Sequence, residues 1–396
     1  MKIGMILDAP FPPDPRVENE AVFLIQQGHD IHLFCFDYQH DAKHYEVIKG
    51  IHVHRHKVGK VIYKLSALAY TLPWYHALVK PAIRQFIKRT GVEALHIHDM
   101  AIARPVIQLA KAFNLPSVLD LHEMRPEIMK FYPHVYNAPG KYLISPDRWE
   151  HFESLYVREA DKVVVVTEEA KVYYEEKLDE PEEKFAVVPN TVRKEFYEKA
   201  KIDTQLTARY ANNFTLLYVG ETGLRRGLIT AIKAIALLKQ SIPNIKLVIV
   251  GKSRTDVILH QKINDLSLSD YIDMEGWQPF EKFQSYIAAA DVGISPIHRN
   301  KHHNTTFANK IFQYMSFGKP ILVSNSDAQE HVVRESNCGL VFEDQNANDF
   351  ATQILRLYQN KKLYDELSAN AKQAIETQYR WDLQARSLKK LYQELA

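Results

Sequence analysis

The chain has 396 residues, of which 46% are hydrophobic and 25% charged, and its formal net charge is +2 at pH 7. This composition is ordinary for a soluble globular protein, allows two domains with full cores, and argues against a disordered or fibrous chain. The small net charge argues against nucleic acid as a general partner.

Neither a membrane span nor a disulfide framework is expected. No apolar run approaches the roughly 18 residues that cross a bilayer, and the N-terminus lacks the pattern of a signal peptide. The two cysteines, Cys35 and Cys338, lie far apart in the sequence, which favours a reducing compartment. We therefore expect a cytoplasmic protein whose membrane contact, if any, is peripheral.

Short apolar segments recur along the first half of the chain, separated by segments with helical spacing. They read KIGMILDA, DIHLFCF, IHVHRHK, ALHIHD, SVLDLHE, KVVVVT and FAVVPN. Several are continuously apolar, which is typical of strands buried on both faces of a parallel sheet. Alternation of such strands with helices predicts an α/β domain.

The second half repeats this pattern with FTLLYVG, KLVIVG, IDMEG, VGISP, PILVSN and GLVFE. Residues 191–213 between the halves are polar and charged, as in a linker. We predict two Rossmann-like, doubly wound domains, 1–190 and 191–375, that face each other across a cleft. Ligands of such sheets bind beyond the C-terminal ends of the strands, so the loops there should carry the chemistry.

A basic segment lies in the first half, because no acidic residue occurs between Glu46 and Glu93 although nine lysines and arginines do. Solvated helix faces are one interpretation. The other is a surface that contacts anionic lipid, since Trp74 and Tyr75 lie in the same segment. A phosphate-bearing acceptor could use the same surface.

Histidines form two further patterns among the 18 in the chain. The alternating His52, His54 and His56 could contribute to a zinc site, but no fourth ligand follows from the spacing, and a solvent-facing strand is the alternative. His98 with Asp99, and His122 with Glu123, each come at a predicted strand end. These four are either site residues or, for the histidines, satisfied structural groups.

Two loops of the second half indicate phosphate binding. Gly220, Gly223 and Gly227 surround Arg225 and Arg226 at a predicted helix start, where guanidinium groups bind phosphate oxygens. A solvated helix start is the alternative.

The second loop, residues 298–310, also ends at a helix, with Thr305 or Thr306 as its expected cap. Lys310 and Gln313 are three residues apart on this short helix and so share one face. That face should look at a polar ligand such as a diphosphate.

In their order, these motifs resemble a retaining glycosyltransferase of family 4 with the GT-B fold. The resemblance covers nearly the whole chain and includes GHDIHLF, VVVVTEEA, LLYVG, RRG, LVIVG, GWQPFEKFQSYIAAADVGISP, NKIFQYMSFGKPILVS and YRWDLQARSLKKLY. It implies an acceptor-binding first domain, a nucleotide-sugar-binding second domain, and a C-terminal segment, 376–396, that contains Trp381 and crosses back to the first domain.

The resemblance also assigns residues, with departures from the family pattern. Thr305 and Gln313 stand where the family has two glutamates, and Glu221 stands where it has an arginine, a role that Arg225 can take over. His122, Arg226 and Lys310 are the implied catalytic residues. The implied donor-binding residues are Arg225, Asn190, Gly276, Trp277, Thr305, Thr306, Phe307, Ala308 and Gln313, and those of the acceptor side are Arg16, His98, Asp99 and Glu123.

The implied activity is metal-independent transfer of a sugar from a nucleoside-diphosphate sugar, UDP or GDP, to a glycan or lipid-linked acceptor with an α-linkage. No cofactor is implied, and the expected location is the cytoplasm, at the inner face of the membrane if it is peripheral. The aromatic segment 124–153 is expected to line the acceptor side. One alternative is a non-catalytic relative that has lost donor binding, given Thr305, Gln313 and Glu221. Another is an oxidoreductase, disfavoured because no strand is followed by the dinucleotide glycine pattern.

Overall fold

The computed structural model describes residues 1–395, with the side chains of all but Lys60, Lys64, Pro133 and His134. The chain forms two compact units. The first contains Met1–Pro189 and the chain from Ala385 onward, and the second contains Asn190–Gln384. Of the segment 376–396, expected to cross back to the first unit, the part before Ala385 belongs to the second.

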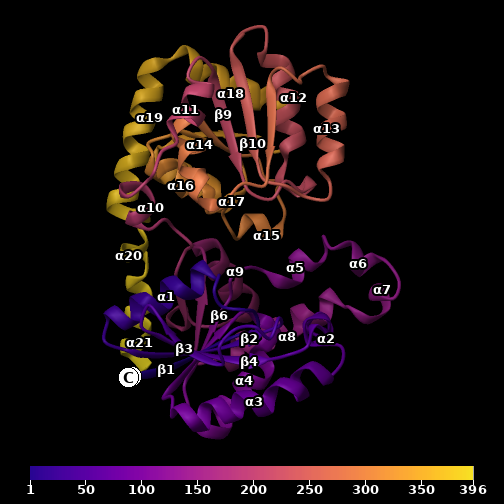
Figure 1. Ribbon diagram of the computed structural model, residues 1–396, viewed down its shortest axis with the longest axis vertical. Coiled ribbons are helices and arrows are strands. Elements are labelled where there is room, and N and C mark those ends of the chain that lie inside the picture. Colours follow the sequence, from indigo (N-terminus) through magenta and orange to yellow (C-terminus); the bar gives the residue numbers. More distant parts are fainter. Residues whose placement is uncertain (396) are drawn as a thin grey trace. The chain divides into compact units, whose positions relative to one another are not determined.

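Among the described residues, the first unit has an eight-stranded sheet with the order β3-β4-β2-β1-β5-β6-β7-β8 (Figure 1). All neighbouring strands are parallel except β3 and β4. The strands are β1 (Lys2–Leu7), β2 (Asp30–Asp37), β3 (Tyr45–Ile48), β4 (Ile51–Lys57), β5 (Ala94–His98), β6 (Ser117–Asp120), β7 (Lys162–Val165) and β8 (Phe185–Val187). All seven predicted strands are confirmed, and β3 is an edge strand that the apolar pattern did not indicate.

Helices join the strands of this sheet. They are α1 (Pro15–Gln26), α2 (Lys60–Ser66), α3 (Trp74–Thr90), α4 (Ala103–Phe113), α5 (Arg125–Met129), α6 (Pro133–Tyr136), α7 (Gly140–Leu143), α8 (Pro146–Glu159), α9 (Glu168–Leu178) and α21 (Arg386–Leu395), with the short turns η1 (Met100–Ile102) and η2 (Glu182–Lys184). Asp14 caps α1 by accepting hydrogen bonds from the amides of Arg16 and Val17, and Pro15 occupies the first helical position. The segment 124–153, for which no regular pattern was predicted, is largely helical.

Among the described residues, the second unit has a six-stranded parallel sheet with the order β11-β10-β9-β12-β13-β14. Its strands are β9 (Phe214–Val219), β10 (Ile245–Val250), β11 (Ile272–Gly276), β12 (Val292–Ser295), β13 (Ile321–Ser324) and β14 (Gly339–Phe342). All were predicted. Apolar side chains are buried on both faces of the sheet, which explains the continuous apolar runs.

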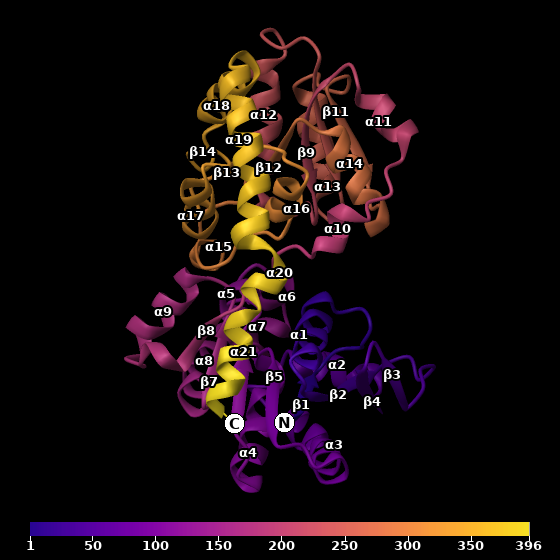
Figure 2. The same ribbon diagram turned by 90° about the vertical axis from the view of Figure 1, so that its left-hand side faces the viewer.

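The helices of the second unit include two in the expected linker, α10 (Lys194–Glu198) and α11 (Thr204–Tyr210). The others are α12 (Leu228–Leu238), α13 (Asp256–Asp265), α14 (Phe283–Ala289), α15 (Lys301–Asn304), α16 (Lys310–Ser316), α17 (Asp327–Ser336), α18 (Ala347–Gln359), α19 (Lys361–Ala374) and α20 (Trp381–Gln384), with the turns η3 (Leu224–Arg226), η4 (Phe280–Lys282) and η5 (Ile375–Tyr379). Figure 2 shows the chain continuing from α19 through α20 into α21. Within residues 1–395, no helix combines the length and the apolar character that crossing a membrane requires.

Candidate active site

In the second unit, basic side chains gather where β9 ends. The chain turns at Gly220, whose φ of +132° favours glycine, and a Cβ atom there would lie 3.1 Å from Nζ of Lys310. Glycine therefore leaves room for an ammonium group directly beside the backbone. The turn leads into η3, where Nε of Arg226 donates a hydrogen bond of 3.1 Å to Oε2 of Glu221.

Lys310, the first residue of α16, is buried with 9% of its surface exposed. Its ammonium lies 3.5 Å from the centre of the Tyr218 ring, and among the described residues no carboxylate lies within ion-pairing distance of it. Burial, together with the nearby Arg226, lowers the pKa of Lys310 well below its usual value, and Glu221 opposes this only in part. An anionic ligand would supply the missing counter-charge.

The loop before α16 differs from the expectation. Thr305 and Thr306 do not cap this helix, whose N-cap position is Asn309; both hydroxyls instead donate hydrogen bonds back to the carbonyl of His302. A local side-chain to backbone bond has replaced the cap. The half-buried Phe307 and Ala308 follow, and the structure gives their backbone amides no hydrogen-bond partner among the residues it describes. These amides are available to a ligand.

Of the remaining predicted donor-binding residues, Gly276 and Trp277 lie at a strand end of the same unit, whereas Gln313 and Asn190 do not. Gly276 ends β11 with a φ of +65°, and the following Trp277 exposes 65% of its surface. An exposed indole next to a glycine, which has no side chain to cover it, is a surface on which a nucleobase can stack. Gln313 is half-buried on α16, and Asn190 is half-buried at the start of the unit.

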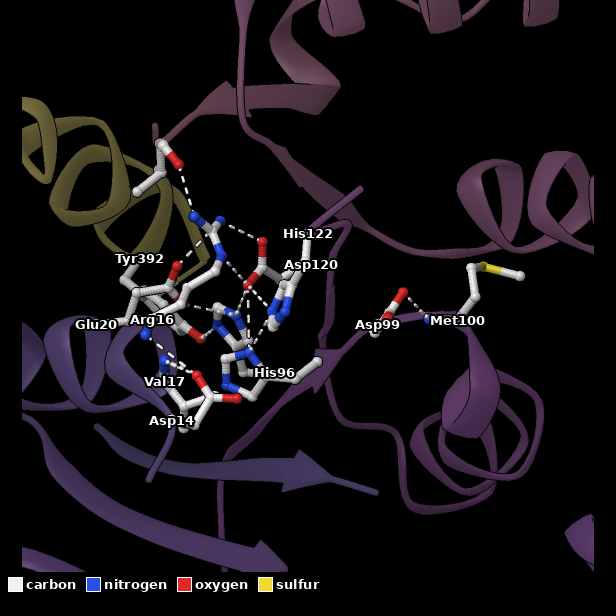
Figure 3. Close-up of polar contacts among 12 residues, drawn as sticks. Asp14, Arg16, Val17, Glu20, His96, Asp99, Met100, Asp120, His122 and Tyr392 are labelled. Carbon is white, nitrogen blue, oxygen red and sulfur yellow. Dashed lines mark hydrogen bonds and ion pairs between the residues drawn. The ribbon is translucent and has the colours of Figure 1, made fainter. Parts of the chain in front are cut away.

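In the first unit, the carboxylate of Asp120 at the end of β6 is the centre of a buried ionic cluster (Figure 3). Its Oδ2 lies 2.9 Å from Nε of Arg16, 2.9 Å from Nε2 of His122 and 3.2 Å from Nδ1 of His98, and its Oδ1 lies 2.5 Å from Nη2 of Arg16. Arg16 also donates to the carbonyl of Val188. Although burial opposes ionisation, Arg16 and His122 hold the pKa of Asp120 well below its usual value.

A second carboxylate extends this cluster toward α21. Glu20 on α1 is fully buried, and its Oε1 lies 3.1 Å from Nη2 of Arg16. Its Oε2 lies 3.3 Å from Nε2 of His96 on β5, whose Nδ1 is 2.8 Å from the hydroxyl of Tyr392 on α21 (Figure 3). The cluster therefore joins α1, β5 and β6 through charges that are paired with one another, and a hydrogen bond to Tyr392 joins it to α21.

His122 is the most accessible histidine of this cluster, with 20% of its side chain exposed. Its Nε2 points to Asp120, so Nδ1 is the nitrogen that remains for a ligand. Burial alone would lower the pKa of His122, but the carboxylate of Asp120 outweighs it and raises the pKa to about 9. His122 is therefore a cation at neutral pH, suited to an anion rather than to accepting a proton.

Carboxylates from the loops after β1, β5 and β6 lie near one arginine in the same unit. Nη1 of Arg125 is 3.2 Å from Oε1 of Glu123 and 4.0 Å from Oδ2 of Asp99. Burial, together with Asp99, raises the pKa of Asp8 after β1 to about 6 and also raises that of Glu123. Asp99 has a φ of +67°, an uncommon backbone conformation for a residue other than glycine. Partly buried carboxylates of this kind can hold the hydroxyl groups of a sugar.

The structure separates the predicted acceptor-side residues into two kinds. Asp99 and Glu123 are partly exposed at strand ends, whereas Arg16 is 5% exposed and His98 is fully buried, both against Asp120. Arg16 and His98 therefore support neighbouring side chains from the interior. Sequence reasoning missed Asp120, Glu20 and Asp8. The sequence did contain a signal for two of them. Asp120 lies within a buried strand and Glu20 on the buried side of a helix, and a carboxylate in either place needs a partner.

Comparisons with known proteins agree with this fold. Residues 201–374 match the family model described as glycosyl transferases group 1, and residues 16–196 match the one described as glycosyltransferase family 4. Together the two models cover most of the chain. The protein belongs to the family 4 glycosyltransferases of the GT-B fold, and it is a glycosyltransferase.

Individual relatives are distant. An uncharacterized glycosyltransferase of Methanocaldococcus jannaschii is 24% identical over 61% of this chain and 60% of its own length, so the match spans less than two thirds of that relative. A lipopolysaccharide core biosynthesis glycosyltransferase of Rhizobium meliloti is 24% identical over 46% of this chain and 49% of its own length. The structure of HepE from Anabaena in complex with UDP is similar in fold, with a TM-score of 0.71, 15% identity and 100% coverage of both chains.

Proposed function

We propose that this glycosyltransferase moves a sugar from a nucleoside-diphosphate sugar to a glycan or lipid-linked acceptor, with retention and thus an α-linkage. The single observation that carries the donor class is the buried ammonium of Lys310, which lacks a carboxylate partner among the described residues. A diphosphate provides the negative charge that this ammonium requires, and the guanidinium of Arg226 is a second group that can bind it.

In this proposal, the residues of the second unit stabilise the leaving diphosphate. Lys310 and Arg226 take up the charge that develops as the bond to the sugar breaks, and the amides of Phe307 and Ala308 add hydrogen bonds. Because these groups supply the positive charge, the reaction needs no metal ion or cofactor. Gln313 accepts a hydrogen bond from a ribose hydroxyl, and Trp277 stacks on the base, which is uracil or guanine.

The first unit provides the acceptor side. His122 presents a cation to an anionic group of the ligand of this unit, while Asp99, Glu123 and Asp8 bind hydroxyl groups of a sugar. The segment 124–153 follows directly and lines the acceptor side. A lipid-linked or polysaccharide acceptor is in keeping with the name of the R. meliloti relative, a lipopolysaccharide core enzyme.

We further propose that the first unit contacts anionic membrane from the cytoplasmic side. Val61 and Tyr63 on α2 and Trp74 and Leu78 on α3 each expose more than half of their surface, and lysines and arginines lie in the same segment. Aromatic and aliphatic side chains next to basic ones suit the interface of an anionic bilayer.

A specific observation favours a second candidate, a GT-B protein that no longer binds a donor. Glu221 forms an ion pair with Arg226. This ion pair neutralises part of the positive charge that the first proposal needs for binding a phosphate. In that case, Lys310 and Arg226 would be what remains of a donor site that no longer binds its ligand.

Calorimetric titration with UDP, GDP, ADP and TDP, without and then with magnesium, separates the two candidates. The transferase proposal expects micromolar binding of one nucleotide that is independent of magnesium and lost in Arg226→Ala. Glu221→Gln should tighten this binding, because it frees Arg226. If no nucleotide binds to the unaltered protein or to Glu221→Gln, the second candidate holds.

A further inference from the structure

Away from the strand ends that carry the candidate site, two histidines and a carboxylate meet on the face of the first sheet. His32 and His52 are direct neighbours on the parallel strands β2 and β4, and Asp30 begins β2 two residues before His32, on the same face. The two imidazole rings stack with centroids 4.7 Å apart and planes inclined by 12°.

We infer that Asp30, His32 and His52 form a binding site for a divalent transition-metal ion, of which Zn²⁺ is the best fit. Two imidazoles and a carboxylate are a common zinc ligand set, with water in the remaining position. One nitrogen of each histidine and one oxygen of Asp30 all lie within 4.8 Å of one another.

The distances within this triad support a metal more than a simple ion pair. Nε2 of His32 is 3.3 Å from Oδ2 of Asp30, and Nε2 of His52 is 3.6 Å from Oδ1. Charge-assisted hydrogen bonds are shorter, about 2.7–2.9 Å. Ligand atoms at about 2.05 Å from a tetrahedral zinc are separated by about 3.3 Å. The separations of Asp30 from the two histidine nitrogens are thus close to those of zinc ligands, and side-chain rotations would bring all three groups onto one ion.

The outer nitrogens of both histidines are already engaged, which leaves the inner ones for the metal. Nδ1 of His52 lies 2.7 Å from the hydroxyl of Tyr45 on β3, and Nδ1 of His32 lies 3.1 Å from Nε2 of His54. When these Nδ1 atoms carry the protons, the Nε2 lone pairs face Asp30. Partners of this kind orient metal-bound histidines and fix their tautomers.

Charge distinguishes this triad from the other histidine cluster of the same unit. Glu20, His96, His98 and Asp120 also lie within reach of a common point. There, however, the guanidinium of Arg16 lies 3.1 Å from Glu20 and 2.5 Å from Asp120 and already neutralises the carboxylates. At the surface triad, the ammonium of Lys2 lies 3.9 Å from Asp30, its side chain is 36% exposed, and it donates a hydrogen bond of 3.0 Å to the carbonyl of Thr90, so it neutralises Asp30 less closely than Arg16 does Asp120.

The consequence of metal binding would be local stabilisation. The site lies at the N-terminal ends of β2 and β4, whereas Asp120 and His122 lie at the C-terminal end of β6, at the other end of the parallel strands. An ion there would tie β2 to β4 directly, and to β3 through Tyr45. It would act as a clamp on this part of the sheet and take no part in sugar transfer.

Calorimetric titration of the full chain, without a histidine tag, with ZnCl₂ tests the inference. We expect one tight site with micromolar affinity and a melting temperature raised by about 3 °C at saturation. His32→Gln and His52→Gln should each weaken zinc binding at least tenfold. The matched control is His56→Gln, two residues beyond His54 on the same face of β4, which should bind zinc like the unaltered protein.

Co²⁺ provides an independent readout, because a tetrahedral cobalt site absorbs visible light far more strongly than an octahedral one. The absorption should be present in the unaltered protein and in His56→Gln, and absent in His52→Gln. Zinc binding that is unchanged in His32→Gln and His52→Gln would overturn the inference, as would affinity weaker than millimolar in the unaltered protein. Circular dichroism verifies that each variant is folded.

Discussion

Nε2 of His122 lies 2.9 Å from Oδ2 of Asp120, and this contact keeps the imidazole protonated at neutral pH. The raised pKa of about 9 has a consequence for stability. A histidine with a folded-state pKa above its unfolded value of about 6.5 stabilises the fold fully below that value. The stabilisation is lost as the pH rises through the folded-state pKa.

We therefore predict that the free energy of unfolding contains a contribution from His122 of about 3 kcal/mol that disappears between about pH 6.5 and 9.5. Urea unfolding at several pH values should show a fall that His122→Gln lacks. The buried Glu153, whose pKa burial raises to about 8, adds a fall of its own in both proteins. The difference between the two curves isolates His122, and parallel curves would refute the prediction.

The second prediction concerns Lys310, which we expect to be important for the ligand and unimportant for the fold. Lys310→Met keeps the aliphatic stem against Tyr218 and removes a buried charge without a carboxylate partner among the described residues. Nucleotide affinity should fall by about ten- to a hundredfold, because a charge-assisted hydrogen bond contributes about 1.5–3 kcal/mol. The melting temperature should stay the same or rise.

Lys319→Met is the matched control for this measurement. Lys319 is a half-buried lysine of the same unit. Unlike Lys310, it has a hydrogen-bond partner among the described residues, because its Nζ donates a hydrogen bond of 3.0 Å to the carbonyl of Ala288. Its replacement should leave nucleotide affinity unchanged. Equal losses of affinity in the two variants would mean that Lys310 acts through the fold and not on the ligand.

The third prediction concerns Trp277, which exposes 65% of its surface after β11. Trp277→Ala should weaken nucleotide binding by about five- to a hundredfold, since stacking of a base on an aromatic ring contributes about 1–3 kcal/mol. The isolated diphosphate should bind as before, because it does not use the ring. Calorimetry with the nucleotide and with pyrophosphate makes the comparison, and a loss with both ligands would contradict it.

The fourth prediction concerns Trp74 on α3, which exposes 58% of its surface. Trp74→Ala should reduce binding to vesicles of phosphatidylglycerol and phosphatidylcholine several-fold in a flotation assay and leave nucleotide binding intact. Trp277→Ala should show the reverse pattern. Binding to vesicles of phosphatidylcholine alone should be weak in every variant, because the basic residues of the segment need anionic lipid. Vesicle binding that is unchanged in Trp74→Ala would contradict the proposed membrane surface.

The strands were predictable from the sequence because burial on both faces makes them continuously apolar, as in β9 and β10. The exception is β3, whose residues alternate between exposed and half-buried at the sheet edge. A four-residue edge strand gives too short a pattern to recognise. The helices of segment 124–153 were missed for a related reason, since most are about one turn long and cannot show a helical period.

The candidate site was predictable only in its residue types and strand-end positions. Arg16 and Asp120 are 104 residues apart, and His96 and Tyr392 are 296 apart, so no local pattern could pair them. Lys310 was expected to face a polar ligand, and no local pattern could indicate that its ammonium also lies over the ring of Tyr218 on β9. Such contacts follow from tertiary packing.

The hydrogen bond between His96 and Tyr392 also constrains how the protein is made. The second unit, Asn190–Gln384, is continuous in sequence, whereas the first needs its final helix, α21, to cover the buried Glu20 and His96. During synthesis on the ribosome, the first unit therefore emerges early but acquires α21 only after the whole second unit has been made. Until then its ionic cluster lacks Tyr392, and a nascent chain arrested before α21 should be the form that chaperones and proteases recognise.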